Sequence, residues 1–583
     1  MKRISLLLPA LALMLFISGC QRPKETVAAH HPDSTFAKLS EEFLKGYFTF
    51  RPGAATYLGL HEYDRAKRDY SKASLAAELQ RLKTFEQKLA PLGDSLSPKA
   101  RFDHKLLLAG IRQEIFTLED LGIYTKNPMT YAGAISLNLF VQRDFAPLDE
   151  RVRSIIAIEE QTPAIFAAAR ENLADSLAKP YVETAILVAR GGADFMEKEL
   201  VEALAQGVTD SLKATFTTVN KKAIEELRGF ATWLEKEKMP KVHQHYAIGK
   251  ANYKKMLLYN EMLDVNPEDI LALGLAELKK EQELFAEVAR KINPNKSAIA
   301  VFEDLKKDHP TADNLIPDAR KNLESIRQFL LDKKIITVPS EVRVEIRETP
   351  QFARSTSTAS MDTPGPFEKA TQAFYYITPV EKTWTTKQKE EWLSQFNYYV
   401  TDIISVHEAY PGHYVQFLHV NASPTSKIQK TFGSYAFIEG WAHYTEKMMI
   451  EEGFGAKDPL TQAKYHLAQL DESLLRLCRL CVSIKTHTEG MSLADATKFL
   501  QDNCYYDYKP AYQEALRGTF DPGYLSYTLG KLQILKLREA YKAQEGANFS
   551  LQKFHDQLLD NGMPPVEMLR EMMLKDQSGG KAF

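Results

Sequence analysis

A cluster of histidines and acidic residues in the second half of the chain carries the strongest chemical signal of the sequence. It begins with His407-Glu408, and His413 follows six residues after His407. Zinc metallopeptidases typically carry His-Glu on a helix with a second His four residues after the first. Both imidazoles then share one face of the helix, and the Glu serves as general base. Here the second histidine stands two residues later than in that pattern.

The stretch between the two histidines predicts how they still meet. On a regular helix, six residues advance roughly 600°, which leaves the two imidazoles about 120° apart. Pro411 cannot donate a backbone hydrogen bond, and its ring crowds the preceding turn. Gly412 tolerates the torsions that absorb two additional residues. We therefore expect a broken helix that lets His407 and His413 bind one ion; the alternative is a kinked helix with two unrelated histidines.

An acidic residue on a following helix offers a third ligand. Glu439 lies 26 residues after His413, and the neighbouring Trp441 argues against a surface helix. Two His and one Glu leave one zinc position open for water. Glu446 lies seven residues after Glu439, about 20° away on a helix, and is expected to accept a hydrogen bond from a ligand imidazole. His443 shares this face and is expected to line the cleft or to replace His413 as ligand.

The donor set predicts one zinc ion, because nitrogen-rich, four-coordinate ligation suits that metal. Glu408 is expected to take a proton from water that the ion activates, and to pass it to the leaving group. Tyr527 and His487, in that order, are the candidate donors to the oxyanion that forms in hydrolysis. The alternatives for these two residues are a core tyrosine and a structural histidine.

The same segments resemble the domain-of-unknown-function 885 proteins, many of them bacterial lipoproteins and regarded as similar to thermolysin-type (gluzincin) metallopeptidases. The matching motifs are His407-Glu408-Ala409-Tyr410-Pro411-Gly412-His413, Glu439-Gly440-Trp441-Ala442, Glu514-Ala515-Leu516-Arg517, Pro522-Gly523, Ser526-Tyr527, Gly530-Lys531 and Arg538. The resemblance covers most of the mature chain and implies that His407, His413 and Glu439 are the metal ligands. It also implies that Glu408 is the base. The chain departs from the family at Tyr414, where a further histidine is frequent.

The first twenty residues have the features of a lipoprotein signal. Lys2 and Arg3 form a positive start, and the apolar stretch that follows is shorter than the about 20 residues of a membrane-spanning helix. Ile17-Ser18-Gly19-Cys20 resembles the bacterial lipobox, which implies cleavage before Cys20 and a lipid on its sulfur; the alternative is a plain secretory peptide. We therefore predict a signal peptide over residues 1–19, an anchor and tether over residues 20–35, and a bacterial cell-envelope protein whose membrane attachment is the lipid on Cys20 alone.

The remaining chain predicts a mainly α fold, a large multi-helix protein with a small β-sheet insertion beside the metal cleft. Helical periodicity from residue 36 to residue 331 predicts a scaffold domain, and residues 332–583 are expected to form the catalytic metal-binding domain. Three β-branched or aromatic runs predict short strands, at residues 335–338, 342–346 and 373–377. A loop rich in Ser, Thr, Pro and Gly is expected between the last two. The edge of such a sheet offers a place for a substrate backbone to add as an extra strand.

Composition excludes several classes of protein. Lys plus Arg (74) nearly equals Asp plus Glu (76), so no basic surface for nucleic acid is expected. Only three cysteines follow Cys20, too few for a disulfide framework. Cys478 and Cys481 have the spacing of a redox or zinc pair, but they lie in an apolar helical run, which favours buried helical cysteines.

Together these features predict a zinc-dependent hydrolase that acts on a peptide or peptide-like substrate. Two alternatives remain from the residues alone. One is a non-catalytic, metal-containing helical binding lipoprotein, against which the intact Glu408 argues, since a structural site needs no base. The other is a metal-dependent amidase or esterase with a non-peptide substrate, because the ligand set does not define the acyl donor.

Overall fold

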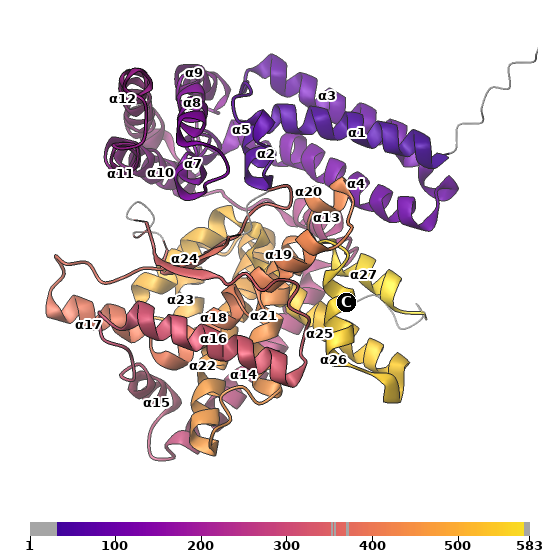
Figure 1. Ribbon diagram of the computed structural model, residues 1–583, viewed down its shortest axis with the longest axis vertical. Helices are drawn as coiled ribbons and strands as arrows, with labels where there is room; N and C mark the ends of the chain where they lie inside the picture. The colour runs from indigo at the N-terminus through magenta and orange to yellow at the C-terminus, as the bar shows by residue number, and fades with distance from the viewer. Residues whose placement is uncertain (1–31, 351–353, 355–356, 369–371, 576–583) are drawn as a thin grey trace, which may run out of the picture.

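Helices make up most of the structure, a computed structural model that describes residues 32–350, 354, 357–368 and 372–575 (Figure 1). The predicted signal peptide and Cys20 lie outside the described residues. Helix α1 begins at Pro32, so residues 32–35 of the expected tether are helical. The predicted mainly α fold with a small sheet is confirmed.

The helices before residue 240 form two groups with separate cores, both at the top of Figure 1. Their bounds are α1 (Pro32–Phe50), α2 (Pro52–Leu58), α3 (Lys72–Leu89), α4 (Pro98–Phe116), α5 (Ile123–Lys126), α6 (Met129–Ala132), α7 (Asn138–Gln142), α8 (Leu148–Glu159), α9 (Thr162–Asn172), α10 (Lys179–Glu197), α11 (Glu199–Ala203) and α12 (Asp210–Trp233). Helices α1, α3 and α4 surround one core, which also takes Phe432 and Met568 from the C-terminal half. Helices α6 to α12 surround the other.

The later helices surround the largest core, below the first two groups in Figure 1. Their bounds are α13 (Lys250–Glu261), α14 (Pro267–Ile292), α15 (Ala298–Leu305), α16 (Leu315–Lys333), α17 (Thr386–Gln395), α18 (Tyr398–Glu408), α19 (His413–Ala422), α20 (Lys427–Thr431), α21 (Tyr435–Glu451), α22 (Pro459–Ile484), α23 (Leu493–Cys504), α24 (Tyr508–Phe520), α25 (Ser526–Glu545), α26 (Leu551–Leu559) and α27 (Val566–Met573). Helix α14 packs along α22, so this core draws on both sides of residue 331. The division into a scaffold domain and a catalytic domain at residue 331 stays a prediction.

The sheet differs from its prediction in two of three strands. The described strands are β1 (Glu345–Glu348), β2 (Ala359–Asp362) and β3 (Phe374–Ile377), in the order β1-β3-β2. Strand β3 lies in the predicted third run and pairs parallel to β1 and antiparallel to β2. The strand predicted at residues 335–338 is wrong: this run is irregular, and its Ile335 and Ile336 are buried in the helical core. Strand β1 begins three residues later than predicted, and β2 lies in the stretch predicted as a loop.

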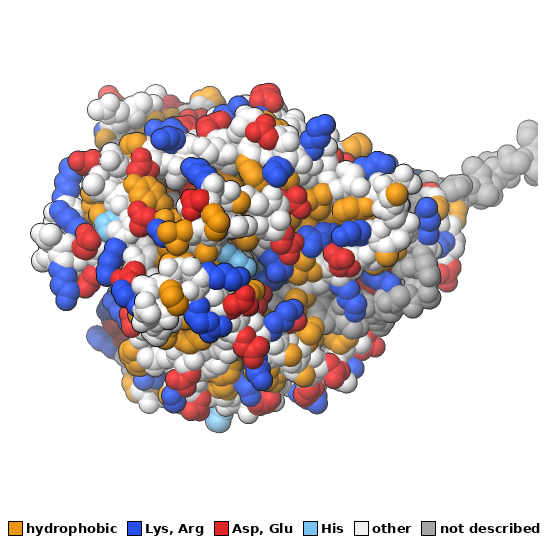
Figure 2. Space-filling view, turned by 90° about the horizontal axis from the view of Figure 1, so that it is seen from below, with side chains coloured by type: hydrophobic (Ala, Val, Ile, Leu, Met, Phe, Trp, Pro, Cys, Tyr) orange, Lys and Arg blue, Asp and Glu red, His pale blue; other side chains and the backbone are white. Residues whose placement is uncertain are grey.

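The cysteines and the surface agree with an ordinary helical protein. Cys478 and Cys481 are buried and free, as predicted for helical core cysteines, and Cys504 is buried and free as well. Over the stretch that the structure describes, no helix is both long and apolar enough to cross a bilayer. Figure 2 shows Lys and Arg side chains interspersed with Asp and Glu on the face that it presents, without a continuous basic area there.

Candidate metal centre

The predicted break between the two histidines is confirmed. Helix α18 ends at Glu408 and α19 begins at His413. The backbone between them folds back onto the last turn of α18, where the Gly412 N–H donates to the Val406 carbonyl at 3.0 Å. A Cβ on residue 412 would collide with the His407 carbonyl, so only glycine fits this approach. The four-residue turn thereby absorbs the spacing that a continuous helix could not.

Two residues next to Glu439 hold its helix, α21, in place. The Trp441 indole is fully buried and donates from Nε1 to the Pro411 carbonyl at 2.9 Å, which ties α21 to the turn before His413. Gly440 meets Gly530 of α25 so closely that a Cβ on either would overlap the other helix. The Glu-Gly-Trp motif therefore combines a candidate ligand with the two contacts that position it.

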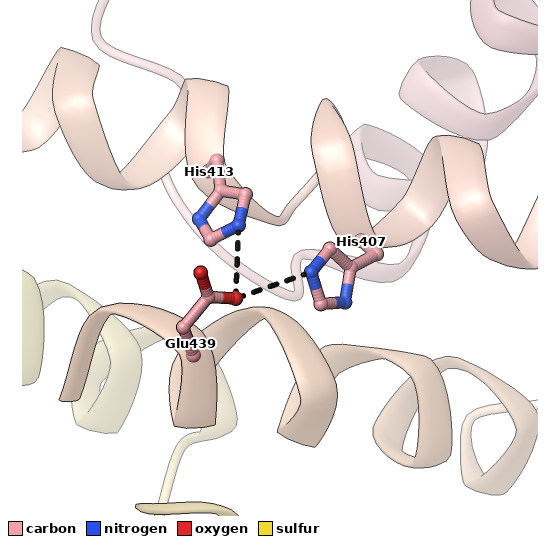
Figure 3. A group of neighbouring side chains, drawn as sticks. All are labelled: His407, His413 and Glu439. Atoms are coloured by element: carbon pink, nitrogen blue, oxygen red, sulfur yellow. Dashed lines mark ion pairs between the residues drawn. The ribbon is translucent and has the colours of Figure 1, made fainter. Parts of the chain in front are cut away.

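The donor atoms of the three candidate ligands lie close together (Figure 3). Both imidazoles point toward the Glu439 carboxylate, whose Oε2 lies 3.6 Å from His407 Nε2 and 3.5 Å from His413 Nε2. These distances exceed those of good N–H···O hydrogen bonds, about 2.7–3.2 Å. Ligands about 2.0–2.1 Å from a tetrahedral zinc stand about 3.3–3.4 Å apart. Among the described residues, these three form the one group whose donor atoms converge enough to hold an ion.

Glu446 joins His407 to a second buried layer. The carboxylate accepts a hydrogen bond from His407 Nδ1 at 2.7 Å and contacts His443 Nδ1 at 3.1 Å. His443 is fully buried, and its Nε2 lies 3.2 Å from the Lys531 ammonium. A neutral His443 that donates from Nδ1 and accepts at Nε2 satisfies both contacts. The structure thus places His443 behind Glu446 and not in the converging group with His413.

Electrostatics make the centre attractive to cations. Burial disfavours the charged imidazole, but the Glu439 and Glu446 carboxylates outweigh it and raise the pKa of His407 to about 10. Burial alone would raise the pKa of the Glu439 carboxyl, but His407 and His413 outweigh burial and hold this pKa well below the ordinary range. Burial and the Lys531 charge lower the pKa of His443 to about 3, which keeps it neutral. A field that holds a proton on His407 equally favours a metal cation at its Nε2.

Tyrosines and an arginine lie beside the ligands. The ring of Tyr527, on α25, lies 6.4 Å from the ring of His407 and 6.0 Å from that of Tyr435. Arg517 donates to the Tyr435 hydroxyl at 2.9 Å, and its guanidinium lies 5.8 Å from the Tyr527 ring centre. Sequence reasoning named Tyr527 but gave no role to Tyr435 or Arg517. In the sequence, Arg517 was marked only by its place in a family motif, and nothing marked Tyr435.

The two remaining candidates for catalysis lie in different surroundings. Glu408 is half-buried at the end of α18, directly after His407. His487 is fully buried, and both of its ring nitrogens have backbone partners: Nε2 donates to the Gly518 carbonyl at 2.7 Å, and Nδ1 accepts from Ile248 N–H at 3.4 Å. Burial lowers the pKa of His487 to about 4. These contacts give no support to the oxyanion role predicted for His487.

Residues 52–573 match the family described as "Bacterial protein of unknown function (DUF885)". The chain belongs to this family. The motifs that converge on the metal group, from His407 to Gly530, all lie inside the matched range. No curated protein matches the sequence.

Two solved structures share the fold of this DUF885 protein. A proposed lipoprotein of unknown function from Shewanella oneidensis is 27% identical, with a TM-score of 0.78 over 93% of this chain and 100% of its own. A proposed lipoprotein from Colwellia psychrerythraea is 16% identical, with a TM-score of 0.72 over 93% of this chain and 98% of its own. The second likeness concerns the fold alone.

Proposed function

We propose that this DUF885 protein is a zinc-dependent hydrolase that cleaves peptide bonds, with a ligand set similar to that of thermolysin-type (gluzincin) metallopeptidases. The observation that carries the proposal is the convergence of His407, His413 and Glu439, whose donor atoms all lie within 4.8 Å of one another. The 3.6 and 3.5 Å from Glu439 Oε2 to the two Nε2 atoms are closer to an edge of a zinc tetrahedron than to a good hydrogen bond. Nitrogen and carboxylate donors in this number suit one zinc ion and leave one position open.

Bound zinc would act as a Lewis acid on a substrate carbonyl and bring the pKa of water near about 7. Glu408 stands next to His407 and takes the proton of the attacking water, then returns it to the leaving amine. Glu446 accepts the Nδ1 proton of His407 and so keeps Nε2 directed at the ligand group. The Tyr527 ring lies beside that of His407, and its hydroxyl is the proposed donor to the developing oxyanion.

We further propose that the mature protein is held at the bacterial cell envelope by lipid on Cys20. The lipobox-like Ile17-Ser18-Gly19-Cys20 supports this anchor, and both structural relatives are described as proposed lipoproteins. Radioactive fatty acid should label the wild-type protein in cells and leave Cys20→Ala unlabelled. Equal labelling of the two would refute the anchor.

The hydrolase is tested by Glu408→Gln, which keeps shape and polarity but removes the proton acceptor. Zinc content and melting temperature should stay at wild-type values, while hydrolysis of a mixed peptide library, read by mass spectrometry, should fall by about 10²–10⁴. Glu391→Gln, an exposed position on α17, is the matched control and should keep full activity. Undiminished turnover in Glu408→Gln refutes the mechanism.

Metal analysis separates the ligands from the base. Wild-type protein should hold about one zinc per chain, and His407→Ala and Glu439→Ala should lose most of it, because a three-ligand site has none to spare. Unchanged zinc in both variants refutes the ligand assignment. If zinc-loaded wild-type protein cleaves no peptide in the library but hydrolyses esters or other amides, the substrate is a non-peptide acyl compound. No hydrolysis at all favours a binding lipoprotein.

A further inference from the structure

A cavity of about 660 Å³ lies among the N-terminal helices and shares no residue with the metal centre. Its walls come from the end of α1, from α2, from Arg68 and Tyr70 in the segment before α3, from residues 114–118 and 123–143, and from Asp362 at the end of β2. The volume is that of an ordinary small-molecule site, for which about 300–1,000 Å³ is typical. Nothing in the proposed hydrolysis uses this space.

Three arginines line the cavity, and two of them are neutralised within the protein. Arg51 pairs with Glu78 and with Glu114, at 2.5 and 2.6 Å. Arg143 pairs with Asp362 on β2 and with Glu368, the latter at 3.4 Å. These four carboxylates account for the charge of both guanidinium groups.

Arg68 is the exception. It is 6% exposed, and its Nη1 is buried without a hydrogen-bond partner in the part of the chain that the structure describes. No described carboxylate lies within 4.0 Å of its guanidinium. Burial lowers the pKa of the group, and the more distant Asp64 carboxylate, which is held by the Thr56 hydroxyl and the His61 imidazole, offsets part of that effect. The guanidinium keeps its charge at neutral pH. A buried guanidinium with no direct ion pair and an unpartnered N–H group costs folding free energy, so it is expected where a ligand completes the pair.

The other residues that line the cavity indicate what the uncharged part of that ligand is. Tyr70 and Tyr124 line the cavity with their ring centres 5.3 Å apart, and Phe50 and Phe140 line it as well. Aromatic walls with one or two placed polar groups are typical of sites for apolar organic molecules. One guanidinium without a direct partner calls for one hydrogen-bonded negative group, and its planar fork suits a carboxylate.

We propose that this cavity is a second binding site, for a small organic monocarboxylate with an aromatic body, whose carboxylate pairs with Arg68. The proposal is independent of the hydrolase, because it uses none of the metal-centre residues. The site selects its ligand by charge at one end and by aromatic contact along the rest.

N-acetyl-L-phenylalanine and its carboxamide are suitable probes, since they differ in charge and share one shape. Isothermal titration calorimetry of the full wild-type protein should show that the acid binds. The dissociation constant of the amide should be at least about tenfold higher, because a charged hydrogen-bonded pair is lost. The same titrations in zinc-loaded and chelator-treated protein should agree, which excludes capture of the acid by zinc. Equal binding of acid and amide, or no binding of either up to about 10 mM, overturns the proposal.

Variants locate the contact. Arg68→Gln should bind the acid as weakly as the amide, and Arg68→Lys should retain part of the difference. Arg65→Gln is the matched control, since Arg65 lies three residues earlier and its side chain is 48% exposed in a surface pair with Glu150. Wild-type affinity in Arg68→Gln overturns the proposal. If Arg68→Gln does not fold, the acid and amide comparison in the wild type still decides it.

Discussion

Replacing Glu446 by glutamine tests whether the residues behind the ligands control the metal. The Glu446 carboxylate lies between two histidines, at 2.7 Å from His407 Nδ1 and 3.1 Å from His443 Nδ1, and its side chain is buried. Both imidazoles donate a proton to it. A glutamine has one acceptor oxygen and one NH₂ group, so Glu446→Gln can satisfy one donor and must face the other with its NH₂.

The magnitude follows from these two contacts. A hydrogen bond to a charged group contributes about 1.5–3 kcal/mol, and one between neutral groups about 0.5–1.5 kcal/mol. If the amide oxygen stays on His407, the loss is about 1–1.5 kcal/mol, or roughly tenfold in the dissociation constant for zinc. That value is at the lower end of the about 10–100-fold typical for such outer contacts. The unsatisfied His443 donor, together with the loss of the Glu446 charge 3.7 Å from Arg476 Nη2, should also lower the stability of the metal-free protein by about 1–3 kcal/mol.

Competition with a chromophoric chelator measures the zinc dissociation constant, and urea unfolding of chelator-treated protein measures the stability. Glu451→Gln is the matched control on the same helix, where the carboxylate pairs with Arg538 at 3.0 Å and is 37% exposed. It should leave zinc affinity unchanged and alter stability by less than about 1 kcal/mol. A dissociation constant for Glu446→Gln within twofold of the wild-type value would refute the reasoning.

Three further predictions concern single buried positions. Glu159 on α8 is 1% exposed, neither of its carboxylate oxygens has a hydrogen-bond partner among the described residues, and burial raises its pKa to about 9. The unfolded chain ionises near its ordinary value, so the wild type loses stability as pH rises from about 4.5 to about 9, by about 3 kcal/mol at pH 7. In melting curves, the stability of Glu159→Gln relative to the wild type should therefore increase as the pH rises from about 4.5 to about 9. The same stability difference at both pH values would contradict the raised pKa of Glu159. His487→Ala should lower the free energy of unfolding by about 1–3 kcal/mol through its two backbone contacts while zinc content stays constant, and zinc loss would indicate a role in the centre. Gly412→Ala should weaken zinc binding because its Cβ would meet the His407 carbonyl, whereas Gly191→Ala, in open space on α10, should not; equal zinc affinity in both would contradict the packing argument.

Local sequence was informative wherever neighbouring residues fix the outcome. The Pro411-Gly412 pair predicted a break between two helices because proline cannot continue the hydrogen-bond ladder and glycine permits the return. Apolar spacing of three and four residues predicted the helices, and the cysteines of α22 followed from the same periodicity. These are interactions over a few residues, and tertiary contacts do not reverse them here.

The strands show where prediction from the local sequence failed. Ile335 and Ile336 have high strand propensity, yet they are buried between helices without a strand partner. Residues 359–362 looked like a loop and became a strand, because β3 offers them backbone hydrogen bonds. Strand propensity reports fit to a half-buried surface, and the partner that decides pairing is remote in sequence.

The sequence by itself determined the kinds of donor, the irregular histidine spacing, the helical class and the family. It left open whether His413 or His443 joins His407, and it gave no function to Gly440 or Trp441. Tertiary structure decided these points, because the Gly440 contact with α25 and the Trp441 hydrogen bond to the Pro411 carbonyl set how α21 lies against the two histidine helices. The same is true of Arg68, since the lack of a direct ion-pair partner depends on every element packed around a side chain and has no pattern along the chain.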